Sequence, residues 1–156
     1  MKTQTAVFAA GCFWGVEEEF RCMKGVLSTR AGYSGGKSKN PTYEEVCSGK
    51  TGYAESVKIE FNLDEVSYED LLRKFWEIHD PTTLNRQGPD IGTQYRSIIF
   101  YFDENQKELA EKSKQKEQKR YKDKIVTEII LATEFYDAEE YHQKYLMKNG
   151  GESCGR

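Results

Sequence analysis

The sequence predicts an α/β (α+β) fold, a two-layer sandwich in which a central mixed β-sheet is flanked by helices. Two observations favour this class. The chain has 156 residues, which suits a single domain with a substantial core. Segments with strand and helix periodicity partly alternate along the chain, and hairpin-like stretches lie between them. We expect one domain over residues 1–148 and a flexible, glycine-rich tail over residues 149–156.

The predicted strands are short runs rich in apolar residues. Alternation is clearest in residues 56–62, where Val57, Ile59 and Phe61 are expected to face the core. The predicted strands are Gln4–Ala10, Val26–Tyr33, Ser56–Asn62, Ser97–Phe102 and Ile125–Leu131.

Helical periodicity is clearest after Ser67, which forms a capping-box pattern with Asp70 three residues later. Pro81 ends that run. Residues 82–95 form a long loop, and compact domains keep such loops mostly for function. The other predicted helices are Gly15–Met23, Glu104–Lys124 and Asp137–Met147, with one helical turn over Thr42–Val46.

Composition excludes several function classes. Hydrophobic residues make up 37% and charged residues 31% of the chain, as in a soluble globular protein, and the net charge is only -3. Nothing in this balance predicts binding to nucleic acid or to a membrane. The N-terminus lacks the basic-then-apolar order of a signal peptide, so we expect a cytoplasmic location.

The chain has four cysteines, and none are spaced as C-x-x-C. With only two histidines, a metal site is not expected, and neither is any cofactor. In a reducing compartment structural disulfides are also not expected. Cys22 and Cys47 are interpreted as structural or incidental.

The most informative motif is Gly11-Cys12-Phe13-Trp14-Gly15, which lies between a predicted strand and a predicted helix. A thiol at a helix N-terminus is stabilised as the thiolate by backbone N–H groups and the helix dipole, so its pKa is expected to fall towards neutrality. Phe13 and Trp14 would form the wall of an apolar pocket beside the nucleophile. The alternative is that Cys12 is a buried, inert small hydrophobe.

Several polar residues lie at the boundaries of predicted elements, where catalytic residues often occur. Taken singly, each is more often a solvated loop residue. These residues are Tyr33, Glu55, Asp80 and Tyr95.

Together with the cysteine motif, these residues give the chain a resemblance to the A-type peptide-methionine sulfoxide reductase family. The resemblance runs from about Ala6 to Gly155. It is carried, in this order, by the motifs Gly11–Gly15, Gly32–Gly36, Pro41–Cys47, Gly52–Glu55, His79–Thr82, Arg86–Gly88 and Gly92–Ser97.

The resemblance implies a ferredoxin-like core, a monomer, and reduction of the S epimer of methionine sulfoxide, free or in proteins. It implies Cys12 as nucleophile and Glu55 as proton donor, and Asp80 near the polar backbone of the substrate or an ordered water. For Asp80 a local hydrogen bond just before Pro81 is an equal alternative. Of the remaining site residues, Tyr33 and Tyr95 would bind the sulfoxide oxygen, and Phe13 and Trp14 would hold the substrate methyl group.

The chemistry explains this choice of residue types. A sulfoxide has no good leaving group, so attack on its sulfur requires the oxygen to be protonated or strongly hydrogen-bonded. A carboxyl that acts as an acid near neutral pH must have a raised pKa, which burial among aromatic rings would produce. We therefore predict a raised pKa for Glu55.

Recycling of the enzyme is expected to use a second thiol. After oxygen transfer Cys12 would be a sulfenic acid, which condenses with a nearby thiol to form a disulfide. Ser153-Cys154-Gly155 matches the first C-terminal cysteine of the family, so Cys154 is the candidate resolving thiol and thioredoxin the expected reductant. A second C-terminal cysteine, which some relatives carry, is absent, so a three-step relay is not expected. Glutathione with glutaredoxin is the alternative reductant.

Two other function classes remain open at this point. A thiol peroxidase would share the reactive and resolving cysteines but would not need a pocket for a methyl group. A non-catalytic binding module would use the aromatic loop surface and would not need the Cys12 thiol.

Overall fold

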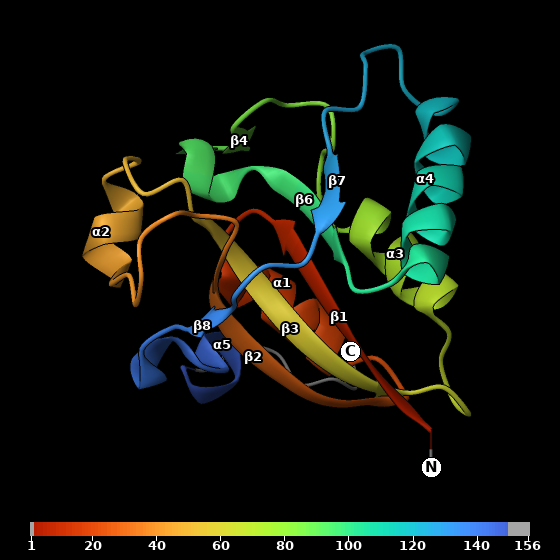
Figure 1. The fold of residues 1–156 in the computed structure, drawn as a ribbon, viewed down its shortest axis with the longest axis horizontal. Helices are drawn as coiled ribbons and strands as arrows, with labels where there is room; N and C mark the ends of the chain where they lie inside the picture. The colour runs from red at the N-terminus through yellow and green to blue at the C-terminus, as the bar shows by residue number, and fades with distance from the viewer. Residues whose placement is uncertain (1, 150–156) are drawn as a thin grey trace.

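The computed structural model describes residues 2–149. Its main feature is a mixed six-stranded sheet in the order β7-β6-β1-β3-β2-β8. All neighbouring strands are antiparallel except β6 and β7, which are parallel. Figure 1 looks onto this sheet, with α4 at one side and α2 at the other. The strands of the sheet are β1 (Thr3–Ala10), β2 (Val26–Ser34), β3 (Ala54–Asn62), β6 (Ser97–Tyr101), β7 (Glu128–Leu131) and β8 (Tyr136–Asp137).

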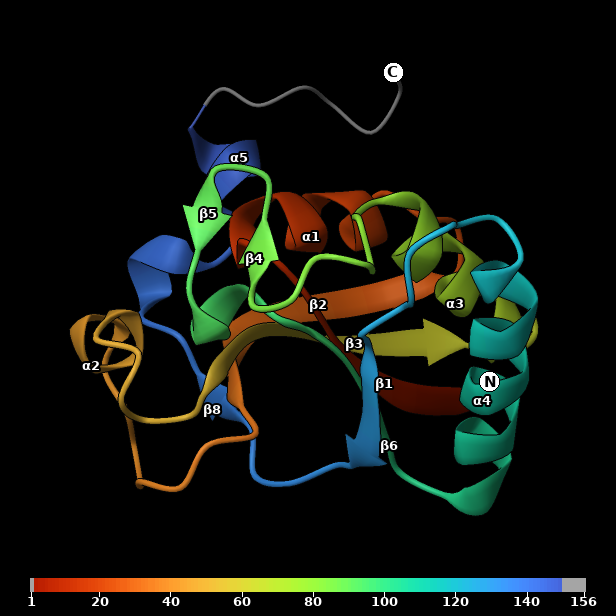
Figure 2. The same ribbon diagram turned by 90° about the horizontal axis from the view of Figure 1, so that it is seen from above.

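Two interleaved β-α-β units form the centre of the sheet. Helix α1 (Phe13–Arg21) connects β1 to β2, which both pair with β3. Helix α3 (Tyr68–Glu77) lies on the path from β3 to β6, which both pair with β1. Figure 2 shows α1 and α3 together on one face of the sheet. This topology confirms the predicted two-layer sandwich with a mixed sheet and a ferredoxin-like core.

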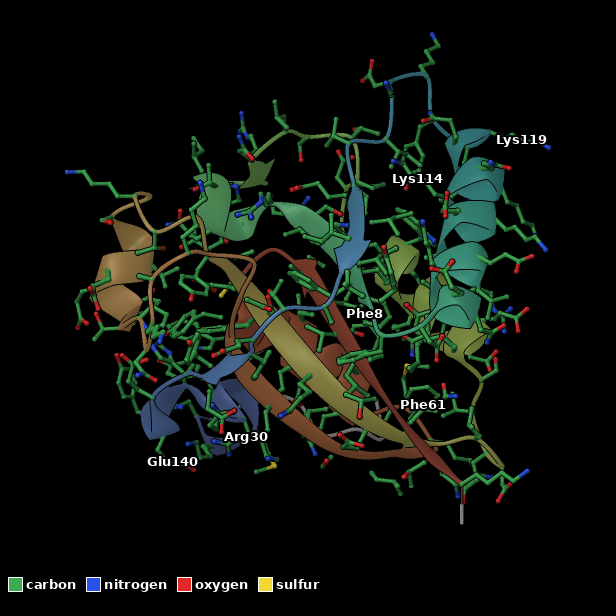
Figure 3. The ribbon with its side chains drawn as sticks, viewed as in Figure 1. Phe8, Arg30, Phe61, Lys114, Lys119 and Glu140 are labelled. Carbon is green, nitrogen blue, oxygen red and sulfur yellow. The ribbon has the colours of Figure 1, made fainter. Side chains whose placement is uncertain are left out.

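The main core lies between these helices and the sheet. Phe8 of β1 is fully buried, and its ring centroid lies 5.3 Å from that of Phe20 in α1 and 5.2 Å from that of Phe75 in α3. Figure 3 labels Phe8 on β1 and Phe61 on the neighbouring β3. The predicted inward residues of β3, which are Val57, Ile59 and Phe61, are all fully buried.

The opposite face of the sheet carries a smaller cluster. It comprises Val7, Ala9, Ala54, Ile98 and Phe100, with Ala132 and Phe135 packed against it. The chain between β7 and β8 crosses this face, as Figure 1 shows. Within residues 2–149 the two faces are therefore covered unequally, by helices on one side and by the extended segment between β7 and β8 on the other.

Local signals placed some helices correctly. The capping box of Ser67 and Asp70 is present at the start of α3, and Thr42 with Glu45 forms another at the start of α2 (Tyr43–Cys47). Helix α4 (Glu104–Gln118) ends six residues before the predicted end at Lys124. The Gln118 side chain there accepts from Ile125 N–H and donates to the carbonyl of Asp123, which folds the chain back.

The predicted helix over residues 137–147 is wrong. This segment begins as the strand β8, continues as the 3-10 helix η2 (Glu140–His142) and ends in the short helix α5 (Tyr145–Lys148). Lys144 is left-handed, with φ of 50°, which breaks the helix. Tertiary hydrogen bonds of this segment override its helical periodicity, as described below.

Two smaller features complete the fold. The loop over residues 82–95 contains a two-stranded ribbon of β4 (Arg86–Gln87) and β5 (Asp90–Ile91), followed by the 3-10 helix η1 (Thr93–Tyr95).

Among residues 2–149, no helix is long and apolar enough to cross a membrane.

His79 follows α3 and is held in a buried hydrogen-bond chain. Its Nδ1 donates to the carbonyl of Phe75 at 2.6 Å, and its Nε2 accepts from the Ser97 hydroxyl at 2.8 Å. Burial lowers the pKa of His79 from 6.5 to about 4. The imidazole is therefore neutral in the folded protein.

We expect His79 to make the stability depend on pH between about pH 4 and 6.5. The unfolded chain binds more protons than the folded one in this window, so the stabilisation is complete above it and is lost as the pH falls. At roughly 1.4 kcal/mol per pKa unit, the loss is about 3 kcal/mol. Urea unfolding of wild type and His79→Gln at several pH values measures it. The variant should show a shallower dependence, and equal slopes in the two proteins would contradict the assignment.

Candidate active site

A tight turn between β1 and α1 presents Cys12. Gly11 has a φ of 103°, which L residues rarely adopt, and a Cβ there would lie 2.9 Å from Cγ of Gln87. Cys12 is the N-cap residue of α1 and is half-buried. The predicted strand–turn–helix context of Cys12 is thus confirmed, and glycine is needed before it for both conformation and space.

Glu55 of β3 lies directly beneath this turn. Its side chain is 1% exposed, and Oε1 accepts a hydrogen bond of 3.1 Å from the backbone N–H of Phe13. Oε2 is buried and has no hydrogen-bond partner among the described residues. Burial raises the pKa of Glu55 to about 7, the charge of Asp90 adds to this, and the Phe13 N–H opposes it. The predicted upward shift of the Glu55 pKa is confirmed.

The expected fall in the pKa of Cys12 is wrong for this site. Burial and the charge of Glu55 raise the pKa of the thiol to about 11, and Asp90 adds a smaller contribution. The backbone N–H groups of Trp14 and Gly15 lower it, as a helix N-terminus should, but they do not compensate. Desolvation and two nearby carboxylates therefore outweigh the helix, and the resting cysteine is a thiol.

Aromatic rings surround the start of α1. Phe13 is 1% exposed, and its ring centroid lies 5.2 Å from that of His142. Trp14 donates from Nε1 to Nδ1 of His142 at 2.9 Å and stacks on Tyr145 with a centroid distance of 3.8 Å and an interplanar angle of 8°. The Nε2 atom of His142 is buried without a hydrogen-bond partner among the described residues. An aromatic wall thus lies next to Cys12.

A surface hollow of about 450 Å³ also contains Cys12. Its walls come from the turn, from α1, from the end of α3 and from the loop over residues 82–95. They are formed by Ala10, Cys12, Gly15, Val16, Glu19, Glu77, Ile78 and Gln87. Cys12 therefore borders this hollow.

Three further residues act electrostatically on this centre. Asp90 raises the pKa of both Cys12 and Glu55. Burial and the charge of Glu55 raise the pKa of Tyr95 to about 12, with smaller contributions from Asp90 and Cys12. The pKa of Tyr43 is raised by burial, by a hydrogen bond with Cys47 and by the charge of Glu55. The Tyr43 and Tyr95 hydroxyls and the Asp90 carboxylate thus lie within electrostatic range of Glu55.

Tyr43 and Asp90 are not among the site residues predicted from the sequence. Tyr43 lies within the family-like motif Pro41–Cys47, so the motif was found but this residue in it was passed over. Asp90 lies in the long loop that was predicted to be functional. His142 and Tyr145 were not predicted to lie near Cys12, because residues 137–147 were assigned to one continuous helix.

Tyr33 and Asp80 have their own local partners. Tyr33 is fully buried opposite Glu55 in the β2–β3 pairing, and its hydroxyl donates to Glu139 at 2.8 Å. Asp80 is exposed and accepts from the backbone N–H and the hydroxyl of Thr82 at 2.9 and 2.6 Å. These bonds lower the pKa of Asp80, consistent with the alternative of a local turn around Pro81.

The remaining cysteine assignments are only partly covered by the structure. Cys47 is exposed at the end of α2. Cys154 lies outside the described residues. Within residues 2–149 no cluster of His, Cys, Asp and Glu could hold a metal ion.

Comparison with known proteins decides the family. A family model described as "Peptide methionine sulfoxide reductase" matches residues 4–155. The chain belongs to the peptide methionine sulfoxide reductase MsrA family. It is therefore a methionine sulfoxide reductase.

Individual relatives agree. The chain is 58% identical over 153 residues to the peptide methionine sulfoxide reductase MsrA of Methanothermobacter thermautotrophicus, covering 97% of this chain and 90% of the relative. The crystal structure of reduced Mxr1 from Saccharomyces cerevisiae matches with a TM-score of 0.91 at 38% identity, over 98% of this chain and 90% of Mxr1. A structure of Mxr1 in complex with Trx2 matches with a TM-score of 0.67 at 27% identity, over 92% and 85% of the two chains.

We expect the alkylation rate of Cys12 in this chain to report the charge of Glu55. Above about pH 7 the carboxyl ionises in wild type and raises the thiol pKa, whereas Glu55→Gln stays neutral. The variant should therefore react faster with iodoacetamide above pH 7, by about tenfold for each unit by which the Cys12 pKa falls. Below pH 7 the two rates should converge.

Mass spectrometry of the Cys12 peptide measures the rate separately from those of the other cysteines. Glu60→Gln, on the same strand, is the matched control and should behave as wild type. An unchanged rate in Glu55→Gln at pH 8–9 would contradict the coupling.

Proposed function

We propose that this chain reduces the S epimer of methionine sulfoxide, free or in proteins, with Cys12 as nucleophile and Glu55 as proton donor. The observation that carries the proposal is the position of Glu55. One of its oxygens accepts a hydrogen bond from the amide of Phe13, which follows Cys12, and the other is buried without a hydrogen-bond partner among the described residues. With a pKa of about 7, a substantial fraction of this carboxyl is protonated at neutral pH.

The proposed chemistry balances without a cofactor. The Cys12 sulfur attacks the sulfoxide sulfur while Glu55 passes its proton to the sulfoxide oxygen, and the thiol proton restores the carboxyl. The S–S bond formed by this attack and the S–O bond of the substrate then break as an S–O bond to Cys12 forms, so the oxygen moves to the cysteine with its new proton. The products are the thioether and a sulfenic acid, so the substrate sulfur is reduced by two electrons and Cys12 is oxidised by two.

The neighbouring hydroxyls supply further stabilisation of the oxygen. Tyr95 and Tyr43 lie within electrostatic range of Glu55, so we assign them as hydrogen-bond donors to the sulfoxide oxygen. Tyr33 was predicted to share this role. The Tyr33 hydroxyl instead donates to Glu139, and the same carboxylate accepts from the Tyr43 N–H at 2.9 Å. We therefore assign Tyr33 an indirect role: it holds the carboxylate that positions Tyr43.

Epimer selectivity follows from contacts at three groups around the substrate sulfur. We assign the methyl group to the wall formed by Phe13 and Trp14, the oxygen to Glu55 and the attacking direction to Cys12. When the positions of the methyl group and the oxygen and the direction of attack are all fixed, the rest of the substrate has only one position left. The two epimers place the rest of the substrate differently, so the site distinguishes them. The family resemblance supports the S epimer.

For recycling we propose that Cys154 condenses with the Cys12 sulfenic acid, releasing water and forming a disulfide that an external dithiol reduces. The Mxr1 structure in complex with Trx2 supports thioredoxin as that dithiol. Direct reduction by glutathione and glutaredoxin is the alternative if Cys154 does not react.

The proposal predicts a specific pattern of turnover. With dithiothreitol, wild type should reduce the S epimer and not the R epimer, Cys12→Ser should be inactive and Cys154→Ser should stay active. With thioredoxin, Cys154→Ser should lose turnover. Glu55→Gln should lose about 10²-fold or more in kcat, as expected when a general acid is removed. Turnover with hydrogen peroxide in place of the sulfoxide, or unchanged activity of Cys12→Ser, would contradict the proposal.

The three tyrosines should differ in their effects. Tyr95→Phe and Tyr43→Phe each remove a donor to the oxygen and should lower kcat by about 10²-fold, in line with the loss of one oxyanion-type hydrogen bond. Tyr33→Phe removes a bond to Glu139 instead and should cost less. A larger fall in kcat for the S epimer in Tyr33→Phe than in Tyr95→Phe and Tyr43→Phe would contradict the indirect role of Tyr33.

A further inference from the structure

Glu17 in α1 is a buried carboxylate that the proposed chemistry does not use. It is 1% exposed, and both of its oxygens are occupied. The Thr29 hydroxyl donates to Oε2 at 2.8 Å, and the backbone N–H of Lys144 donates to Oε1 at 2.7 Å. Burying a carboxylate costs free energy unless it is hydrogen-bonded, so these two bonds account for its presence in the core and indicate its structural role.

The Lys144 amide is an unusual partner. Lys144 has the left-handed φ of 50° that ends η2 and starts α5, and α5 has no side-chain cap at this residue. An L residue in this conformation is strained. The hydrogen bond from the Lys144 N–H to the Glu17 carboxylate can hold Lys144 in this left-handed conformation.

The segment that Glu17 holds carries much of the aromatic wall. His142, two residues before Lys144, accepts from Trp14 Nε1, and Tyr145, the next residue, stacks on the Trp14 indole. Glu139, earlier in the segment, accepts from the Tyr33 hydroxyl and the Tyr43 amide. Figure 2 shows α5 lying over the start of α1.

Other contacts tie the same segment to β2 instead. The Gln143 side chain accepts from Ala31 N–H at 2.7 Å and donates to the Ala31 carbonyl at 2.8 Å. Arg30 pairs with Asp137 at 3.0 Å and with Glu140 at 3.6 Å, and Figure 3 labels Arg30 and Glu140 side by side. Gln143 and Arg30 therefore fix the segment to the sheet, whereas Glu17 fixes it to the helix that begins with Phe13 and Trp14.

We propose that Glu17 is a positioning residue for the substrate pocket, which holds the Lys144 backbone so that Tyr145 and His142 keep the Trp14 indole in place for the substrate methyl group. The inference rests on the proposed function, because it assigns the methyl group to the Trp14 wall. Glu17 acts through Trp14 and touches neither the sulfoxide oxygen nor the Cys12 thiol.

Steady-state kinetics of Glu17→Ala and Glu17→Gln with the S epimer test this assignment, with wild type as reference. Glu17→Ala should raise KM by about tenfold, the order of one lost aromatic contact, while kcat changes by less than about twofold. Glu17→Gln keeps an oxygen that can accept from Lys144 N–H, so its KM should return close to that of wild type. Thr29→Val removes the other bond of Glu17 and leaves the Lys144 bond, so it is the matched control and should keep the wild-type KM.

Tryptophan indole N–H signals in ¹H–¹⁵N NMR spectra give a readout independent of turnover. The Trp14 signal, assigned with Trp14→Phe, should shift in Glu17→Ala and not in Thr29→Val. An unmoved signal together with an unchanged KM in folded Glu17→Ala overturns the inference. If wild type reduces no sulfoxide, the proposed function fails, and the NMR shift still decides whether Glu17 positions Trp14.

Discussion

The site depends on one buried hydrogen bond, from the Phe13 amide to the Glu55 carboxyl. It joins the centre of the sheet, through β3, to the turn that presents Cys12. Glu55 accepts with Oε1, and its second oxygen is buried without a hydrogen-bond partner among residues 2–149. Burial also raises its pKa to about 7, so part of the carboxyl population is protonated at neutral pH, as the proposed proton donor requires. The carboxyl is thus placed, and its acidity set, by the packing around this bond.

Electrostatic competition around Cys12 sets its resting state. The helix N-terminus favours the thiolate, but burial and the carboxylates of Glu55 and Asp90 favour the thiol more strongly. A thiol reacts slowly with nonspecific oxidants and alkylating agents, because the thiolate is the nucleophilic form. Chemistry is then coupled to Glu55, since its protonation removes one of the charges that hold the thiol pKa high. In the proposed reaction the two groups therefore act as a coupled pair.

The pocket wall is made from two distant parts of the chain. Phe13 and Trp14 begin α1, whereas His142 and Tyr145 come from the irregular segment near the end of the described residues. That segment is held by buried side chains with backbone partners, Glu17 to Lys144 and Gln143 to Ala31. Such bonds fix an irregular backbone that its own secondary structure does not stabilise.

The sequence by itself determined the fold class, most of the elements and the strand–turn–helix context of Cys12. Alternation in Ser56–Asn62 and the capping box at Ser67 are local patterns, and both are present in the structure. The motif around Cys12 and the burial of Glu55 were also predictable, because both belong to short segments. Tertiary structure alone decided the rest. The path of residues 137–147 depends on hydrogen bonds to β2 and α1. The pKa of Cys12 depends on desolvation and on nearby charges, and the approach of Asp90 and Tyr43 to Glu55 depends on how distant segments pack. None of these can be read from the local order of residues.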